Sequence, residues 1–168
     1  MEDADNRELT VIGRAERVDL PKQGINRIPA KTDTGADSSS IWGTNIHEAP
    51  EGLECTLFGP GSEFYTGEKL FFAPGEYEVT RVANSFGHRE FRYRIKLAIR
   101  VKGRLVNGRF TLADRSRMTY PILLGRRLLS GKFVVDVKSG EPLLQEERAK
   151  RQDLKKDIQE LKEIGEIG

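Results

Sequence analysis

The sequence predicts an all-β core followed by a C-terminal amphipathic helix. The clearest sign of a strand is the stretch 91–104, in which apolar and basic residues alternate so that one face would be buried. Turn-forming residues divide the chain into short segments, and no helical period appears before residue 121. From Gln145 charged residues dominate, and apolar residues recur every three or four positions. These apolar residues are Leu154, Ile158, Leu161 and Ile164.

The N-terminal part of the core is expected to begin with two neighbouring strands. Leu9–Gly13 starts the first strand, and residues 14–20 continue it to the turn signal Pro21–Gly24. Residues 25–33 would then return beside it. Residues 44–69 contain several Gly and Pro residues, which predicts a loop-rich insertion whose role the sequence does not show.

The second half of the core is expected to contain a β-hairpin and a strand, helix, strand unit. The strand 91–104 should turn at Gly103 and the pair Asn107-Gly108, because these residues tolerate positive φ, and return through residues 109–113. A short strand, a short helix and a second strand are expected at 121–125, 126–129 and 133–137.

Length and composition favour one domain with a tail. At 168 residues the chain can bury one core, so residues 1–144 are interpreted as one domain and residues 145–168 as a charged helical tail. This tail could pack on its own domain, pair with a second subunit or recruit a partner protein. Its apolar stripe is short, which favours packing over an independent coiled coil.

Charge and cysteine content narrow the function classes. Lys and Arg number 28 against 26 Asp and Glu, a net charge of +2 that does not point to nucleic acid. The single cysteine, Cys55, excludes an intrachain disulfide, and the acidic N-terminus has no apolar run behind it. No stretch has the length and hydrophobicity of a membrane span. We therefore expect a soluble cytoplasmic protein that binds neither nucleic acid nor membrane.

The most informative motif is Asp33-Thr34-Gly35-Ala36, which is typical of the active-site turn of an aspartic peptidase. One carboxylate alone is a poor catalyst, whereas two carboxyl groups that share a proton can hold and activate a water molecule. Because the chain supplies one such turn, we expect it to act as a homodimer in which Asp33 of each subunit meets at the dimer axis.

Further motifs in the sequence strengthen the interpretation of the Asp33 turn as part of an aspartic peptidase. Together with the Asp33 turn, Ile122–Leu129 resembles the paired signatures of retropepsins, which are single-domain dimeric aspartic peptidases. Across residues 9–140 the chain resembles the prokaryotic RimB-like branch of these proteins, a family often labelled "ATP-dependent zinc protease". The motifs that carry this resemblance are Val11–Arg14, Lys31–Ala36, Gly87–Glu90 and Leu124–Arg127. The resemblance implies an acid-protease β-barrel with one active-site turn per chain.

The resemblance also implies roles for the residues of the turn. Asp33 would be catalytic, Thr34 would bond across the axis to the partner turn, and Gly35 would let backbone amides approach the carboxylates. Ala36 would leave the floor of the cleft open. Asp37 differs from the arginine common in the RimB-like branch and matches retropepsins, which predicts an ion pair with Arg126 beneath the turn. The alternative is two separate surface charges.

Retropepsins close over substrate with a β-hairpin flap, and the matching segment here is 81–93. Its tip and the start of its second strand supply the candidate substrate-binding residues Ser85, Phe86, Gly87, His88 and Arg89. An ordinary exposed hairpin is the alternative. Basic residues in this segment would suit an acidic peptide, although a solvated strand face would have the same composition.

The motif search does not support the zinc or ATP label. The chain has no Gly-rich phosphate loop and no His-Glu-x-x-His pair, and His47, His88 and Cys55 form no ligand spacing. We expect no metal and no cofactor.

Two functional hypotheses follow. The first is a homodimeric aspartic endopeptidase acting on a peptide or protein tail, for which the RimB-like resemblance implies glutamate-rich sequences. The second is a catalytically silent peptide-binding module that partners an ATP-grasp ligase. An intact Asp33 favours the enzyme.

Overall fold

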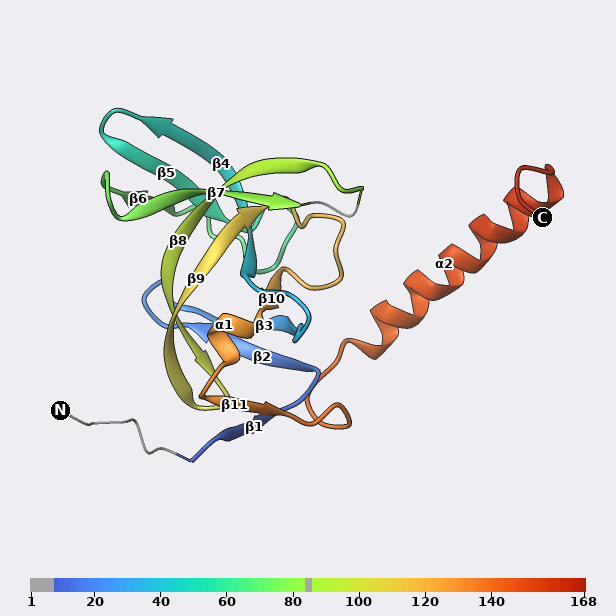
Figure 1. Cartoon of the computed structure of the whole chain (residues 1–168), viewed down its shortest axis with the longest axis horizontal. Helices are drawn as coiled ribbons and strands as arrows, with labels where there is room; N and C mark the ends of the chain where they lie inside the picture. The colour runs from blue at the N-terminus through green and yellow to red at the C-terminus, as the bar shows by residue number, and fades with distance from the viewer. Residues whose placement is uncertain (1–7, 84–85) are drawn as a thin grey trace.

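The computed structural model describes residues 8–83 and 86–168. Within this part of the chain, six strands close into a β-barrel in the order β10-β3-β2-β8-β9-β4, and β4 pairs back to β10 (Figure 1). The barrel strands are β2 (Ala15–Leu20), β3 (Ile25–Thr32), β4 (Ser39–Ala49), β8 (Arg89–Val101), β9 (Arg104–Ala113) and β10 (Ile122–Leu124). The mostly β architecture predicted from the sequence is confirmed.

The remaining elements are attached to this barrel. Two strands, β5 (Gly52–Leu57) and β6 (Lys69–Phe72), extend the sheet beyond β4. The strand β7 (Tyr77–Ala83) pairs with the first half of β8. A parallel pair, β1 (Thr10–Ile12) with β11 (Phe133–Val135), forms a separate small sheet. The helices are α1 (Arg126–Leu129) and α2 (Leu144–Glu163).

The alternation in β8 predicts its buried face correctly for the second half of the strand. Ile95 and Ile99 are at most 1% exposed because they point into the barrel. Phe91, expected on the same buried face, is 69% exposed. This first half of β8 pairs with β7, where the strand extends past the barrel core.

The predicted position of the next turn is partly wrong. The chain reverses at Lys102 and Gly103, which have φ values of 51° and 77°, so Val101 pairs with Arg104 across a two-residue turn. Asn107 and Gly108, which the sequence placed in the turn, lie inside β9. A Cβ at position 108 would lie 2.6 Å from a methyl carbon of Leu128, so this glycine serves packing rather than turning.

The prediction of a loop-rich insertion over residues 44–69 is also wrong for its first half. The strands β4 and β5 form an antiparallel hairpin in which Ala49 pairs with Gly52. Leu53, Cys55 and Leu57 alternate along β5 and are buried, a period-two pattern that the nearby Gly and Pro residues obscured.

The C-terminal helix is present as predicted, and it projects from the barrel in Figure 1. All residues of α2 are described, and none of them is buried. The packing expected from the sequence is therefore limited to its first turns. None of the helices in the described residues is long and apolar enough to cross a membrane.

Candidate active site

Asp33 follows the last residue of β3, and its carboxylate is held by the backbone of its own turn. The Oδ1 atom of Asp33 accepts hydrogen bonds from the amides of Gly35 (3.0 Å) and Ala36 (3.1 Å). The Asp33 amide donates to the carbonyl of Leu124 at 2.9 Å. These bonds fix the orientation of a half-buried carboxylate at the end of a barrel strand.

The strand β10 pairs with both strands that flank the Asp33 turn, β3 before it and β4 after it. It runs parallel to β3 and antiparallel to β4, so it lies between the two strands that flank the motif. The next residue, Gly125, donates its amide to the hydroxyl of Ser39 at 2.9 Å. A Cβ at position 125 would lie 2.6 Å from the backbone carbonyl of Ser38, so this close approach requires glycine.

The predicted ion pair between Asp37 and Arg126 is confirmed at 3.1 Å. Arg127 also contacts Asp37, at 3.0 Å. The side chains of Asp37 and Arg126 are 50% and 58% exposed, so the pair lies at the surface rather than beneath the turn. Desolvation alone would raise the pKa of Asp37, but the hydrogen bonds and charges of the two arginines together hold this pKa below its ordinary value.

The other predicted site residues occupy two places. Thr34 and Gly35 are exposed at the tip of the turn, and Ala36 is half-buried behind them. The strands β7 and β8 form the predicted hairpin, in which Ala83 pairs with Arg89.

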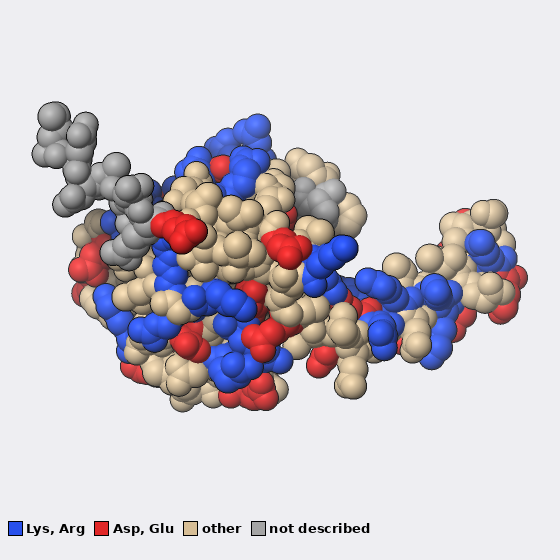
Figure 2. Space-filling model, turned by 90° about the horizontal axis from the view of Figure 1, so that it is seen from below, with Lys and Arg blue, Asp and Glu red and all other residues tan. Residues whose placement is uncertain are grey.

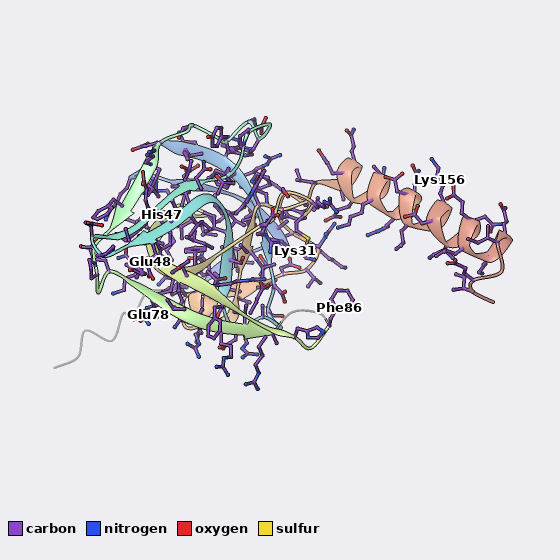
Figure 3. The ribbon with its side chains drawn as sticks, turned by 90° about the horizontal axis from the view of Figure 1, so that it is seen from above. Lys31, His47, Glu48, Glu78, Phe86 and Lys156 are labelled. Atoms are coloured by element: carbon purple, nitrogen blue, oxygen red, sulfur yellow. The ribbon has the colours of Figure 1, made fainter. Side chains whose placement is uncertain are left out.

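At the hairpin tip, Phe86 is 84% exposed and Gly87 has a φ of 77°. His88 and Arg89 are also exposed, and Ser85 lies outside the described residues. Figures 1 and 3 place the hairpin tip, where Phe86 is labelled, on the same side of the barrel as α2. None of the described tip residues lines the pocket that contains Asp33. The function of the hairpin as a flap therefore stays a prediction.

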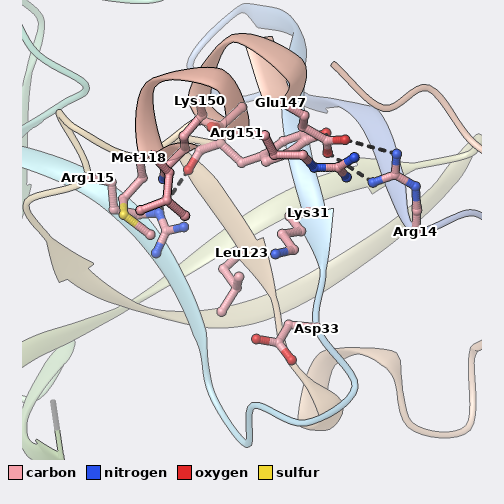
Figure 4. A pocket seen from close by; sticks show the side chains of 12 residues that line it. Arg14, Lys31, Asp33, Arg115, Met118, Leu123, Glu147, Lys150 and Arg151 are labelled. Atoms are coloured by element: carbon pink, nitrogen blue, oxygen red, sulfur yellow. Dashed lines mark hydrogen bonds and ion pairs between the residues drawn. The ribbon is translucent and has the colours of Figure 1, made fainter. Parts of the chain in front are cut away.

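A pocket of about 600 Å³ lies beside Asp33, between the barrel and the first turns of α2 (Figure 4). Its lining combines many basic side chains with two carboxylates and some apolar surface. The basic residues are Arg14, Lys31, Arg115, Lys150 and Arg151, and the carboxylates are Asp33 and Glu147. On the face shown in Figure 2, acidic and basic side chains are interspersed. The excess of cations in the pocket is therefore not part of a larger basic surface on that face.

A hydrogen-bond network anchors α2 at this pocket. The guanidinium of Arg14 donates to both carboxylate oxygens of Glu147, at 2.9 and 3.0 Å. The buried hydroxyl of Tyr120 donates to Glu147 at 2.8 Å and accepts the amide of Leu143 at 2.9 Å. The hydrogen bond from Arg14 holds the pKa of Glu147 below its ordinary value, against an opposing effect of desolvation.

Arg115 is the most deeply placed cation near Asp33. Its Nε donates to the carbonyl of Tyr120 at 3.0 Å. Burial lowers the pKa of Arg115, and the neighbouring charge of Arg92 lowers it further, whereas Asp33 opposes both effects. The low-dielectric surroundings of this guanidinium make it a strong contact for an additional anion.

The sequence did not indicate this pocket. Arg14 and Glu147 are separated by 133 positions, and neither belongs to a motif of metal ligands or catalytic groups. The tail pattern directed attention to the apolar residues of α2, of which Leu154 lines the pocket, whereas it gave no role to Glu147, Lys150 and Arg151, which line it as well. A useful signal would have been the presence of Lys150 and Arg151 on the same helical face as Glu147.

The closed six-stranded barrel that carries the Asp-Thr-Gly turn has a retropepsin-like fold. Residues 73–143 match the model of the RimB-like family, described as "Retropepsin-like aspartic endopeptidase RimB". The resemblance to this family, predicted from the motifs, is thereby confirmed. The matched segment contains Arg126 but not Asp33, and it ends one residue before α2 begins.

Curated relatives carry a different name. A "Probable alpha-L-glutamate ligase" of Shewanella pealeana (strain ATCC 700345 / ANG-SQ1) is 31% identical over 128 residues, which cover 75% of this chain and 28% of the relative. A protein of the same name from Desulfotalea psychrophila (strain LSv54 / DSM 12343) is 27% identical over 136 residues, with coverages of 75% and 28%. The chain therefore spans about 28% of the length of these relatives.

A solved structure shares the fold. The crystal structure of a Legionella pneumophila protein with unknown function (DUF785) aligns with a TM-score of 0.58 and 24% identity. The alignment covers 79% of this chain and 97% of that protein. This likeness concerns the fold alone.

Proposed function

We propose that the protein is a homodimeric aspartic endopeptidase that hydrolyses peptide bonds with a water molecule activated by Asp33 of two copies. The observation that carries the proposal is the orientation of the Asp33 carboxylate, whose Oδ1 accepts two backbone amides of its own turn. The carboxylate is thereby oriented by the backbone of its own turn, as a group that pairs with a second carboxyl requires.

The surface around the turn supports pairing of two copies. Thr34 and Gly35 are exposed, so a second turn can approach them. Next to them lies an open depression of about 580 Å³, with Leu129, Phe133 and Val135 among its lining residues. This depression combines apolar side chains with the Asp37, Arg126 and Arg127 charges, and a symmetric contact would bury the same mixed patch on both copies.

The proposed chemistry follows from two carboxyl groups that share one proton. The ionised Asp33 removes a proton from water as the water oxygen bonds to the scissile carbonyl carbon. The protonated Asp33 of the other copy gives its proton to the carbonyl oxygen. The tetrahedral gem-diol then collapses: one hydroxyl gives its proton to the ionised carboxylate, the C–N bond breaks, and the protonated carboxyl gives its proton to the leaving nitrogen.

We further propose acidic, glutamate-rich tails as substrates. Five basic side chains line the pocket beside Asp33, and such a surface favours a negatively charged peptide. The name of the curated relatives, which refers to glutamate ligation, is consistent with a protein that encounters added glutamates. The cytoplasm, expected from the sequence, is the corresponding location.

A second candidate function is a catalytically silent peptide-binding module that partners an ATP-grasp ligase. It is favoured by the name of the relatives, of which this chain matches about 28%. A module of this kind would use the same pocket to hold an acidic tail without cleaving it.

The deciding experiment measures cleavage of a peptide panel that includes glutamate-rich tails, from about pH 4 to 8, together with the oligomeric state. Asp33→Asn should abolish cleavage, whereas Asp157→Asn, on the exposed part of α2, should not. Cleavage that persists in Asp33→Asn would overturn the aspartic mechanism. A confirmed dimer that binds but never cleaves the acidic peptides would favour the module instead.

A further inference from the structure

We propose that the first turns of α2 form one wall of a carboxylate-binding subsite, in which Lys150 and Arg151 select acidic side chains of the substrate next to Asp33. This inference rests on the proposed function and deepens it, because it assigns specificity to a helix that begins after the segment matched by the family model. Lys31 and Arg115 complete the subsite from the barrel side.

The first step of the argument concerns charge. Glu147 is neutralised by two hydrogen bonds from Arg14, so this pair contributes little to the net charge of the pocket. The four remaining cations outnumber the one remaining carboxylate, that of Asp33, although the charge of Arg151 also helps to lower the pKa of Glu147. A concave site with this excess of positive charge attracts anions and concentrates them near the carboxylate of Asp33.

The second step concerns pairing. Among the described residues, Lys31, Lys150 and Arg151 form no ion pair, although each lines the pocket. Arg115 gives its Nε to a backbone carbonyl and is partly removed from water, which lowers its pKa. A bound carboxylate would supply Lys31 and Lys150 with an acceptor, and it would give Arg115 and Arg151 a further one beside the Tyr120 carbonyl and Glu147.

The third step concerns geometry. Glu147, Lys150, Arg151 and Leu154 are spaced i, i+3, i+4 and i+7 and line the same pocket, so they share one face of α2. The hydrogen bonds of Glu147 to Arg14 and Tyr120 hold this face against the barrel (Figure 4). The helix face that carries Lys150 and Arg151 is therefore in place before a ligand arrives, which reduces the entropy cost of binding.

Apolar lining residues define the ligand more closely. Met118, Leu123 and Leu154 contribute nonpolar surface beside the cations. A glutamate side chain matches this combination, because its two methylene groups can contact apolar atoms while its carboxylate reaches a cation. Inorganic phosphate or a nucleic-acid backbone has no comparable apolar part.

The test measures binding separately from catalysis. A fluorescent peptide of consecutive glutamates and its glutamine counterpart are titrated against the full chain carrying Asp33→Asn, which prevents cleavage by the proposed mechanism. Lys150→Gln with Arg151→Gln should weaken binding of the glutamate peptide about tenfold. Binding of the glutamine peptide should be weak and should not change.

A matched control removes the same two residue types from the same helix. Arg148 and Lys156 are exposed and do not line the pocket, so replacing both with glutamine should change the affinity less than about twofold. Circular dichroism checks that α2 is retained in both double variants. Equal weakening by the two double variants would show a non-specific charge effect and overturn the subsite.

The outcomes separate this inference from the proposed activity. Selective loss of acidic-peptide binding in the Lys150 and Arg151 variant supports the subsite even if the wild type cleaves nothing. If the wild type cleaves acidic peptides but the same substitutions in an intact Asp33 background leave KM and kcat unchanged, the subsite is overturned and the peptidase stands. A subsite of this kind predicts a higher KM with little change in kcat.

Discussion

Replacing Glu147 with alanine should release α2 from the barrel. Glu147 accepts two hydrogen bonds from Arg14 and one from the buried Tyr120 hydroxyl. None of the residues of the fully described helix α2 is buried, so little apolar contact holds it in place. The free energy that fixes the helix at the pocket therefore depends heavily on this one carboxylate.

The magnitude follows from the exposure of the partners. The Arg14 side chain is 38% exposed, so solvent screens the ion pair and reduces its contribution to about 1 kcal/mol. The hydrogen bond from the buried Tyr120 to a charged acceptor contributes a further ~1 kcal/mol or slightly more. A total of about 2 kcal/mol corresponds to a roughly 30-fold increase in the equilibrium for local opening.

Hydrogen exchange over residues 144–152 measures this opening directly. Glu146→Ala is the matched control, because Glu146 also lies in the first turn of α2 but takes no part in the Arg14 network. Exchange should accelerate in Glu147→Ala and remain near the wild-type rate in Glu146→Ala. Equal protection of α2 in both variants would refute the anchoring argument.

The same anchor should depend on pH. The pKa of Glu147 is lower in the folded protein than its reference value of 4.5, because Arg14 favours the ionised carboxylate. A lowered carboxyl pKa gives stability that is present above about pH 4.5 and is lost as the pH falls through the folded value. Exchange protection of α2 in the wild type should therefore be constant near neutrality and decline below about pH 4.5, and Glu147→Ala should remove this decline.

Three further predictions concern the barrel. Gly125→Ala should destabilise the protein by about 2–3 kcal/mol in urea denaturation, because its Cβ would lie 2.6 Å from the Ser38 carbonyl. Gly35→Ala is the control and should be tolerated, since the nearest contact of its Cβ would be at 3.4 Å. Arg126→Ala should leave the melting temperature close to that of the wild type, since the pair is half-exposed and Arg127 still contacts Asp37; a large decrease would contradict this reasoning. Burial raises the pKa of the Cys55 thiol to about 11, so iodoacetamide at pH 8 should label the native protein far more slowly than the unfolded chain.

The fold could be predicted from the sequence where one physical effect dominates. Alternation along residues 95–101 reports burial directly, and the turn motif with its downstream glycine identifies the strands β3 and β10. The errors arise where a residue has two possible roles. Gly108 is compatible with a turn but serves packing against Leu128, and Phe91 follows the alternation although its part of β8 extends beyond the core.

The site could be predicted only in its local part. The Asp33 turn and the Asp37 to Arg126 contact are encoded in short motifs, so the sequence indicated both. The pocket depends on contacts between Arg14, Tyr120 and Glu147, which are distant along the chain and are charged or polar residues of common type. No sequence period distinguishes such contacts from ordinary solvated residues.

If two copies pair, the cations of α2 would be present twice in the shared cleft. A twofold axis through the Asp33 turns repeats every element, so each copy would bring its own Lys150 and Arg151 to the shared cleft. Cationic subsites would then lie on both sides of the scissile bond. A substrate with one acidic residue could satisfy one side, whereas a run of acidic residues would satisfy both. Cleavage should therefore be most efficient with glutamate on both sides of the bond, and replacing the glutamates on either side with glutamine should raise KM.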